Sequence, residues 1–189
     1  MKLRASRIFL LLSLTVPVAA CASFKPIRVV APELMGLICT EQGVCVDDKK
    51  LIPQAAALKQ DAVAYLEHHV GTFVTAPRIL YCSSATCAKS YGFSSQGAYT
   101  VGSFGIVVGP RGWQPHFVRH ELIHHLQVER WGSLRTWLLK PDWLIEGMAY
   151  SLSKDPRHPL PEPLQRWRQR FEEWHATAGE DLWTEADKQ

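Results

Sequence analysis

Three features that would place this chain in a large protein class are missing from its sequence. The longest apolar run covers residues 8–16, which is shorter than the about 20 residues that a membrane-spanning helix needs. The chain has no glycine-rich phosphate-binding loop, which argues against a nucleotide hydrolase. It has no G-x-S-x-G elbow, which argues against a serine hydrolase. It also has no internal repeat or low-complexity tract, so we expect an ordinary folded domain.

The chain also lacks a surplus of charge outside its first twenty residues. Lys2, Arg4 and Arg7 are three of its 21 basic residues, so the remainder carries 18 basic and 18 acidic residues. A nucleic-acid-binding surface needs an excess of basic side chains on one face. The balance therefore predicts no nucleic-acid partner, and it disfavours purely electrostatic attachment to an anionic membrane.

Residues 1–20 have the layout of a secretory signal peptide. Three basic residues precede the apolar run, and small residues follow it. The segment continues as Val18-Ala19-Ala20-Cys21, which resembles the lipobox of bacterial lipoproteins. The resemblance implies cleavage before Cys21, lipidation of that cysteine, and a short tether over residues 21–36. The alternative is ordinary signal cleavage near Ala20 and a free secreted protein.

The chain contains five cysteines, and an odd number in an exported protein requires an explanation. Lipidation of Cys21 would leave four cysteines, in two pairs that each close a short loop. Because export implies an oxidising compartment, we expect the disulfides Cys39–Cys45 and Cys82–Cys87. Four cysteines allow three pairings. A zinc site made of all four is a further alternative, although the wider spacing fits a zinc knuckle poorly.

Hydrophobic periodicity predicts one α+β domain over residues 37–189, in which a short sheet precedes two helices that carry the chemistry. Segments with helical spacing alternate with short runs of β-branched and aromatic residues. The expected helices cover about Pro53–Val70, Pro115–Trp131, Asp142–Ser153 and Glu162–Ala178. The other expected segments are a strand at Ile27–Val30, a loop or hairpin over 37–50, a strand over 72–82, a loop over 83–97 and a strand or hairpin over 98–108.

Residues 120–124 read HELIH, an H-E-x-x-H motif inside a predicted helix. Residues four apart lie on one face of a helix, so His120 and His124 can bind a single Zn²⁺. Glu121 lies about 100° round the helix from His120, close enough to reach a water on the metal. Zinc lowers the pKa of such a water towards about 7, and a carboxylate can accept its proton. The alternative is a polar helix face without a metal.

A catalytic zinc site needs a third protein ligand and one open position. Glu146 lies in the apolar stretch 143–150 of the next predicted helix, and an ionised carboxylate is costly to bury unless it is paired or coordinated. The connection between the two helices is long enough for them to fold antiparallel. We therefore expect Glu146 beside the two histidines. The alternative is a salt bridge to a nearby arginine.

The segments HELIH (120–124) and WLIEGMA (143–149) together resemble the gluzincin metallopeptidases, a zinc class with two histidine ligands and one glutamate ligand. The resemblance implies a small zincin-like domain that hydrolyses peptide bonds. It also implies these roles: zinc ligation by His120, His124 and Glu146, and general-base catalysis by Glu121.

The resemblance further implies an edge strand just before the motif helix, which residues 98–108 would supply. An extended substrate could add to that strand through main-chain hydrogen bonds. One departure concerns Tyr150, which stands where the thermolysin pattern has an aspartate. The partner of a zinc histidine is therefore unassigned, and Tyr150 is a candidate for stabilising the oxyanion.

The sequence as a whole predicts a lipid-anchored zinc metallopeptidase of the cell envelope, acting on a peptide or protein substrate. Cys21 is followed by Ala22 rather than aspartate, which in the enterobacterial sorting pattern resembles targeting to the outer membrane, facing the periplasm. The alternative is a non-catalytic envelope lipoprotein whose structural or vestigial metal site serves binding or assembly.

Overall fold

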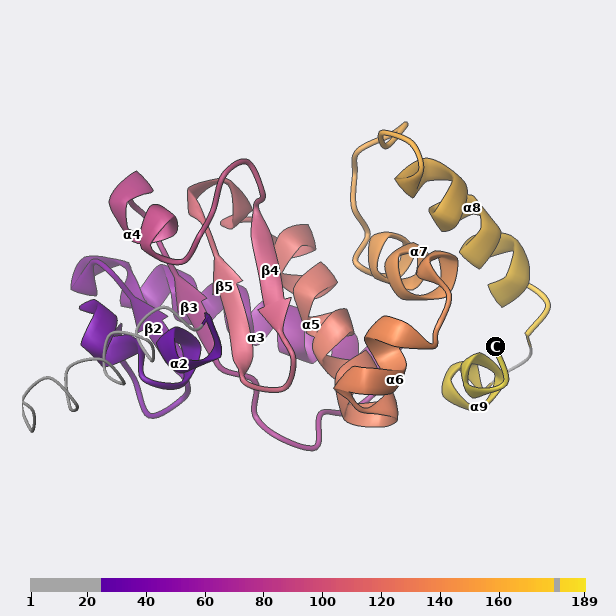
Figure 1. Ribbon diagram of the computed structural model, residues 1–189, viewed down its shortest axis with the longest axis horizontal. Helices are drawn as coiled ribbons and strands as arrows, with labels where there is room; N and C mark the ends of the chain where they lie inside the picture. The colour runs from indigo at the N-terminus through magenta and orange to yellow at the C-terminus, as the bar shows by residue number, and fades with distance from the viewer. Residues whose placement is uncertain (1–24, 179–180) are drawn as a thin grey trace, which may run out of the picture.

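The computed structural model describes residues 25–178 and 181–189, where the chain has a mixed α+β fold with one five-stranded sheet (Figure 1). The strands are β1 (Ile38–Cys39), β2 (Val44–Val46), β3 (Ile79–Tyr81), β4 (Ala98–Val101) and β5 (Gly105–Val108). The α-helices are α2 (Lys25–Val30), α3 (Ile52–His69), α4 (Ala85–Ser90), α5 (Pro115–Trp131), α6 (Ser133–Leu138), α7 (Asp142–Leu152), α8 (Leu164–His175) and α9 (Leu182–Asp187). Short 3-10 helices are η1 (Pro32–Met35), η2 (Lys49–Leu51) and η3 (Pro110–Gly112).

The strand order is β1-β2-β3-β5-β4, which places β4 at one edge of the sheet. The central strands β2, β3 and β5 run parallel to one another, whereas β1 and β4 are the antiparallel members of two hairpins. Every residue of the three central strands is buried, as expected for a sheet covered on both faces.

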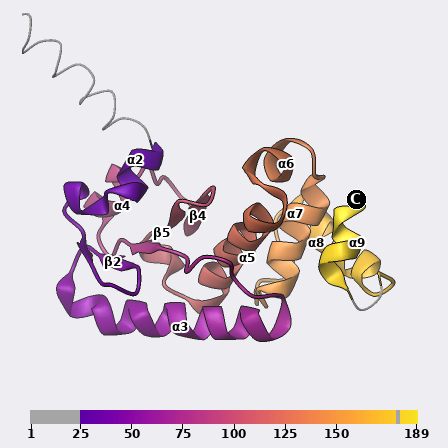
Figure 2. The same cartoon turned by 90° about the horizontal axis from the view of Figure 1, so that it is seen from below.

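Helices cover the two faces of the sheet, and each face has its own core. Alternate residues of a strand point to opposite faces, so Val46, Tyr81 and Val108 join the larger apolar cluster with α3 and α5. Leu80 and Val107 join a smaller cluster with α2 and α4. Figure 2 shows α3 on one side of the sheet and α2 and α4 on the other. α5 lies next to β4 and therefore beside the free edge of the sheet.

The helix that carries the H-E-x-x-H motif has the predicted bounds. Pro115 lies in its first turn, where a missing N–H is tolerated, and Gly132 follows its last residue with a φ of 77°. The helix predicted over Pro53–Val70 is confirmed as α3. The hairpin interpretation is confirmed for both 37–50 and 98–108.

The predicted strand at Ile27–Val30 is wrong, because these residues belong to α2. The β-branched run favours a strand locally, but Val29 reaches the smaller core cluster from a helix. The loop predicted over 83–97 contains α4, whose first turn is capped by the hydroxyl oxygen of Ser84. α6 and α9 are two further short helices that the periodicity did not predict.

The strand predicted over 72–82 is confirmed only at its end, in β3. The backbone N–H groups of Val74 and Thr75 donate to the carboxylate of Glu129 at 3.0 and 2.9 Å. A distant side chain therefore satisfies the backbone groups that a longer strand would have paired.

The two predicted disulfides are confirmed. Cys39 and Cys45 are facing residues of the β1–β2 hairpin, with Cα atoms 4.0 Å apart. Cys82 follows β3 and pairs with Cys87 of α4 at a Cα distance of 5.3 Å. These bonds use the four cysteines that the alternative zinc site required.

Cys21 and the predicted signal peptide lie outside the described residues, and within residues 25–178 and 181–189 no helix is both long and apolar enough to cross a bilayer.

Candidate metal centre

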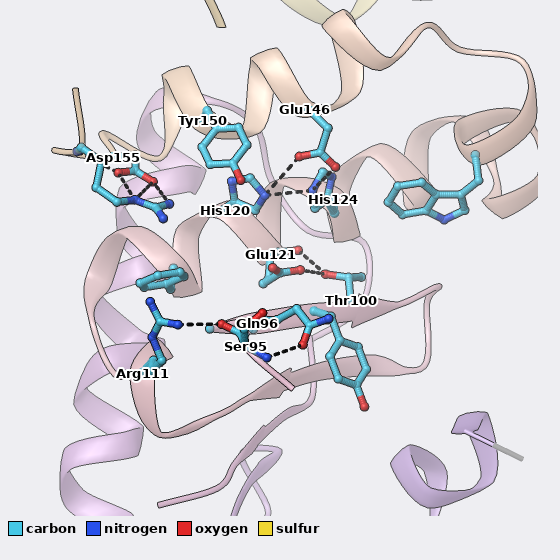
Figure 3. A pocket seen from close by; sticks show the side chains of 16 residues that line it. Ser95, Gln96, Thr100, Arg111, His120, Glu121, His124, Glu146, Tyr150 and Asp155 are labelled. Carbon is cyan, nitrogen blue, oxygen red and sulfur yellow. Dashed lines mark hydrogen bonds and ion pairs between the residues drawn. The ribbon is translucent and has the colours of Figure 1, made fainter. Parts of the chain in front are cut away.

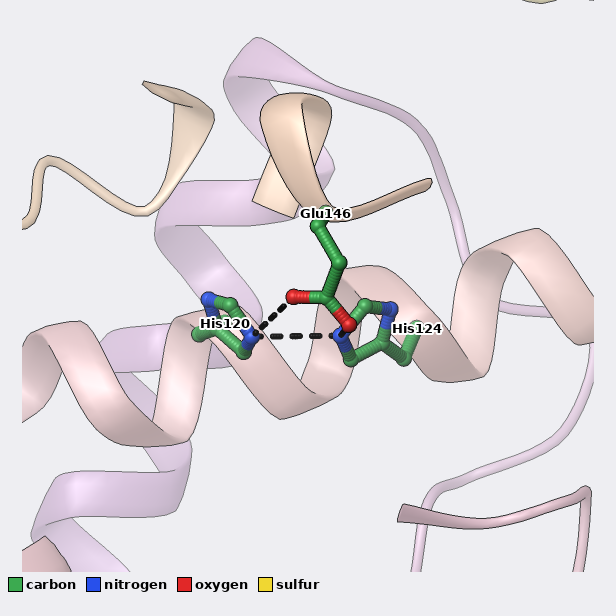
Figure 4. Close-up of side chains that lie close together, drawn as sticks. All are labelled: His120, His124 and Glu146. Carbon is green, nitrogen blue, oxygen red and sulfur yellow. Dashed lines mark hydrogen bonds and ion pairs between the residues drawn. The ribbon is translucent and has the colours of Figure 1, made fainter. Parts of the chain in front are cut away.

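α5 and α7 bring two imidazoles and one carboxylate to a single point (Figure 4). The Nε2 atoms of His120 and His124 are 3.1 Å apart. The two carboxylate oxygens of Glu146 each lie 3.6 Å from one of these nitrogens. Within the described part of the chain these three side chains form a group that could hold a metal ion, with ligand atoms all within 4.8 Å of one another.

The donor separations fit a small divalent cation. Ligand bonds of about 2.0–2.2 Å in a tetrahedral site place ligand atoms about 3.3–3.6 Å apart, close to the three separations between His120, His124 and Glu146. Burial raises the pKa of Glu146, but its hydrogen bond to His120 and the charges of both histidines outweigh this effect and bring the pKa to about 2. The carboxylate is therefore ionised and available as a ligand. Glu146 pairs with these histidines and not with an arginine among the described residues.

Gln127 fixes the orientation of His124. Its Oε1 lies 2.8 Å from Nδ1 of His124, and its Nε2 donates to the carbonyl of Ile145 at 3.0 Å. Because a carbonyl can only accept, the amide nitrogen must face Ile145 and the amide oxygen must face the imidazole. Nδ1 of His124 therefore carries the proton, which leaves the lone pair on Nε2 directed at the metal position. Gln127 is fully buried and supplies the imidazole partner that the sequence left unassigned.

Glu121 lies beside the cluster without belonging to it. Its side chain is buried, and Oγ of Thr100 on β4 donates to its Oε2 at 2.7 Å (Figure 3). Burial raises the pKa of Glu121, while the charge of His124 and the hydrogen bond from Thr100 act in the opposite direction. A carboxyl group with a raised pKa accepts a proton more readily than an exposed one.

The cluster forms part of the wall of an open cleft of about 390 Å³. Residues 95–100 border one side, Trp137 of α6 contributes to the lining, and Tyr150 of α7 lies opposite β4 (Figure 3). The Tyr150 ring packs edge-on against His120 at 4.4 Å between centroids. Burial and the charge of Glu146 raise the pKa of Tyr150 to about 12. The phenol is therefore neutral near pH 7 and can donate a hydrogen bond into the cleft.

An ion pair closes the wall of the cleft beyond Tyr150. Asp155 is almost fully buried, and its carboxylate accepts from Nε and Nη2 of Arg157. The guanidinium also lies over the rings of Phe117 and Tyr150, with distances of 4.9 and 5.8 Å to their centroids. Asp155 thus fixes the position of the Arg157 guanidinium, which forms part of the surroundings of the Tyr150 ring.

The two other histidines of α5 do not belong to the candidate metal cluster. His116 packs against the ring of Phe117 at 4.6 Å and is not among the residues that line the cleft. His125 is buried against Phe73, and its Nε2 lies 3.3 Å from a carboxylate oxygen of Glu129. His116 therefore packs one turn before His120, outside the lining of the cleft, and His125 packs on another face of the helix.

The structure places all five predicted site residues of the two helices at this cleft. The four disulfide cysteines lie elsewhere, at the β1–β2 hairpin and at α4. Two further residues, Thr100 and Gln127, were missed by the sequence reasoning. Gln127 could have been found from its position three residues after His124, on the same helix face.

The chain matches no protein-family model, no curated protein and no solved structure.

Proposed function

We propose that this protein is a zinc-dependent peptide hydrolase of the gluzincin type. The observation that carries the proposal is the convergence of His120, His124 and Glu146, with the buried carboxyl of Glu121 next to them. Histidine nitrogens and one carboxylate at these separations are a ligand set that zinc prefers. An open cleft on one side of the cluster leaves room for a substrate.

The residues of the site have the following roles in the proposed reaction. A bound zinc ion would supply Lewis-acid polarisation of the substrate carbonyl and would acidify a water molecule. Glu121 accepts the proton of the attacking water and later donates it to the nitrogen of the leaving amine. Thr100 donates to one oxygen of Glu121 and so restricts the orientation of the carboxylate beside the metal position. Tyr150, neutral in this environment, donates a hydrogen bond to the developing oxyanion.

The edge strand β4 supports a polypeptide as the substrate class. β4 is paired on one side, with β5, and residues 98–100 line the cleft. An extended peptide can add to such an edge through main-chain hydrogen bonds, which recognise backbone more than side-chain identity. The scissile carbonyl would then lie between β4 and the metal position.

The sequence motif at residues 18–21 supports a location in the cell envelope. Cleavage before Cys21 and lipidation would anchor the chain, with the outer membrane as the proposed location. Two confirmed disulfides fit an oxidising compartment. Cys21→Ser is expected to lose the covalent lipid, which is measured by incorporation of a labelled fatty acid into the wild type and the variant. A wild type without label, or equal label in both proteins, would refute lipidation of Cys21, because a contact between the folded domain and a membrane adds no label.

The alternative is a non-catalytic envelope lipoprotein with a metal site that serves binding or assembly. Zinc content and cleavage of an unfolded protein substrate should be measured for the wild type and for Glu121→Gln, which keeps the side-chain shape. We expect zinc in both proteins and cleavage by the wild type alone. Zinc in both proteins without cleavage by either would support the alternative. Absence of zinc from the wild type would refute both functions.

A further inference from the structure

A ridge of exposed apolar side chains lies at α6, beside the cleft. Leu134, Leu138 and Leu139 are each 71% exposed, and Trp137 is 44% exposed. We call these four residues the α6 ridge. Large apolar side chains that gather on a surface mark a site of interaction, whereas single ones are ordinary. Trp137 belongs to both the ridge and the cleft, and its ring lies 5.4 Å from that of His124.

Other exposed apolar residues belong to, or follow directly after, elements on the same side of the molecule as α6. Phe104 is 52% exposed in the turn between β4 and β5, and Val30 and Leu34, at the end of α2 and in η1, are 51% and 83% exposed. Figure 2 places α2, β4 and α6 on the side opposite α3, which is the side facing the viewer in Figure 1. Seven of the nine large apolar side chains exposed in the described residues thus belong to α2, to α6 or to the segments that follow α2, β4 and α6 in the chain.

The closeness of Cys21 to α2 in the sequence indicates what covers this side. Lys25 is the first residue of α2 and comes four residues after Cys21. Four residues span at most about 14 Å, so a lipid on Cys21 would hold α2 within that distance of a bilayer. Leucines with a tryptophan among them are also the side chains that enter the interfacial region of a membrane.

We propose that the α6 ridge, together with the exposed apolar residues of α2, η1 and the β4–β5 turn, docks on the surface of a lipid bilayer. The bilayer contact adds to the single attachment point at Cys21 and fixes the orientation of the domain. Because Trp137 lines the cleft, the cleft then opens next to the lipid surface. As a consequence that rests on the proposed function, the preferred substrates are polypeptide segments close to the membrane.

The test measures quenching of tryptophan fluorescence by brominated acyl chains. The full chain, as cells produce it, is reconstituted into phosphatidylethanolamine–phosphatidylglycerol vesicles with and without brominated lipid. Trp137→Phe is compared with Trp174→Phe, a matched control on α8. We expect quenching in the wild type and in Trp174→Phe, and loss of most of it in Trp137→Phe. Equal quenching in the two variants, or none in the wild type, would overturn the proposal.

A second variant separates lipid docking from other uses of the ridge. Leu134→Ser combined with Leu138→Ser changes two side chains that are each 71% exposed, so its unfolding temperature should equal that of the wild type. We expect weaker quenching of Trp137 in this variant. A dimer in detergent that the double variant abolishes, with no quenching in vesicles, would instead assign the ridge to self-association. Neither measurement uses hydrolysis, so failure here is distinguishable from failure of the proposed function.

Discussion

Replacing Gln127 with leucine should weaken metal binding even though Gln127 is not a ligand. The substitution removes the oxygen that accepts from Nδ1 of His124 at 2.8 Å and keeps most of the side-chain volume. The imidazole then loses the bond that fixes its tautomer and its ring orientation. Loss of such a partner typically lowers metal affinity about 10- to 100-fold, which corresponds to about 1.4–2.8 kcal/mol.

The same substitution should also destabilise the fold, so the two effects have to be separated. The carbonyl of Ile145 in α7 would lose its side-chain donor inside the core, and loss of one such hydrogen bond costs about 0.5–1.5 kcal/mol. Gln165→Leu is the matched control: Gln165 is another buried glutamine, and its Oε1 accepts from the N–H of Leu160 at 2.9 Å, away from the cleft. We expect it to lower the free energy of unfolding without changing zinc affinity.

Zinc affinity is measured by competition with a fluorescent chelator, and stability by urea unfolding. Gln127→Glu keeps an acceptor for His124 and loses the donor to Ile145, so we expect near wild-type affinity with reduced stability. If Gln127→Leu folds and binds zinc as tightly as the wild type, the assignment of the proton to Nδ1 of His124 is wrong.

Three further predictions follow from individual contacts. Thr100→Val removes the donor to Glu121 and should lower kcat/KM about tenfold, the equivalent of about 1.4 kcal/mol; unchanged kinetics with unchanged zinc content would contradict it. Gly147→Ala places a Cβ 2.4 Å from a backbone carbonyl of α8, so urea unfolding should show a loss of about 1–3 kcal/mol, and a stabilised variant would refute the packing argument. Burial raises the pKa of Asp155, but hydrogen bonds from Arg157 outweigh it and hold the pKa below its usual value. The ion pair therefore stabilises the folded state above the unfolded-state pKa of Asp155, and this contribution is lost as pH falls through the folded-state pKa. In urea titrations below about pH 4, the stability of the wild type should fall more steeply than that of Asp155→Asn. Parallel curves would contradict this prediction.

Local sequence patterns were sufficient to predict the elements that carry the candidate site. The helix Pro115–Trp131 is bounded by a proline and a glycine, and these signals act within a few residues. Its histidines share a face because helical geometry requires it. The disulfides were also predictable, since each joins cysteines five or six positions apart.

The remaining contacts depend on tertiary placement, which no local pattern contains. Thr100 reaches Glu121 because of the way α5 packs beside the edge strand β4. Gln127 bridges α5 and α7 because α7 returns antiparallel after α6, a helix that the periodicity did not predict. In α2 a local pattern gave the wrong prediction. The β-branched residues prefer a strand, but burial of Val29 in the smaller core from a helix overrides that preference.

The third candidate ligand also depends on a contact far from the cleft. Gly147 follows Glu146 directly, and α8 approaches α7 so closely there that no side chain larger than hydrogen fits between Gly147 and the Trp167 carbonyl. Phe171 of α8 is fully buried in the same interface. α8 therefore fixes the position of α7, and with it the carboxylate that lies 3.6 Å from each imidazole. A glycine that weakens an isolated helix is here a requirement for the close packing that orients Glu146.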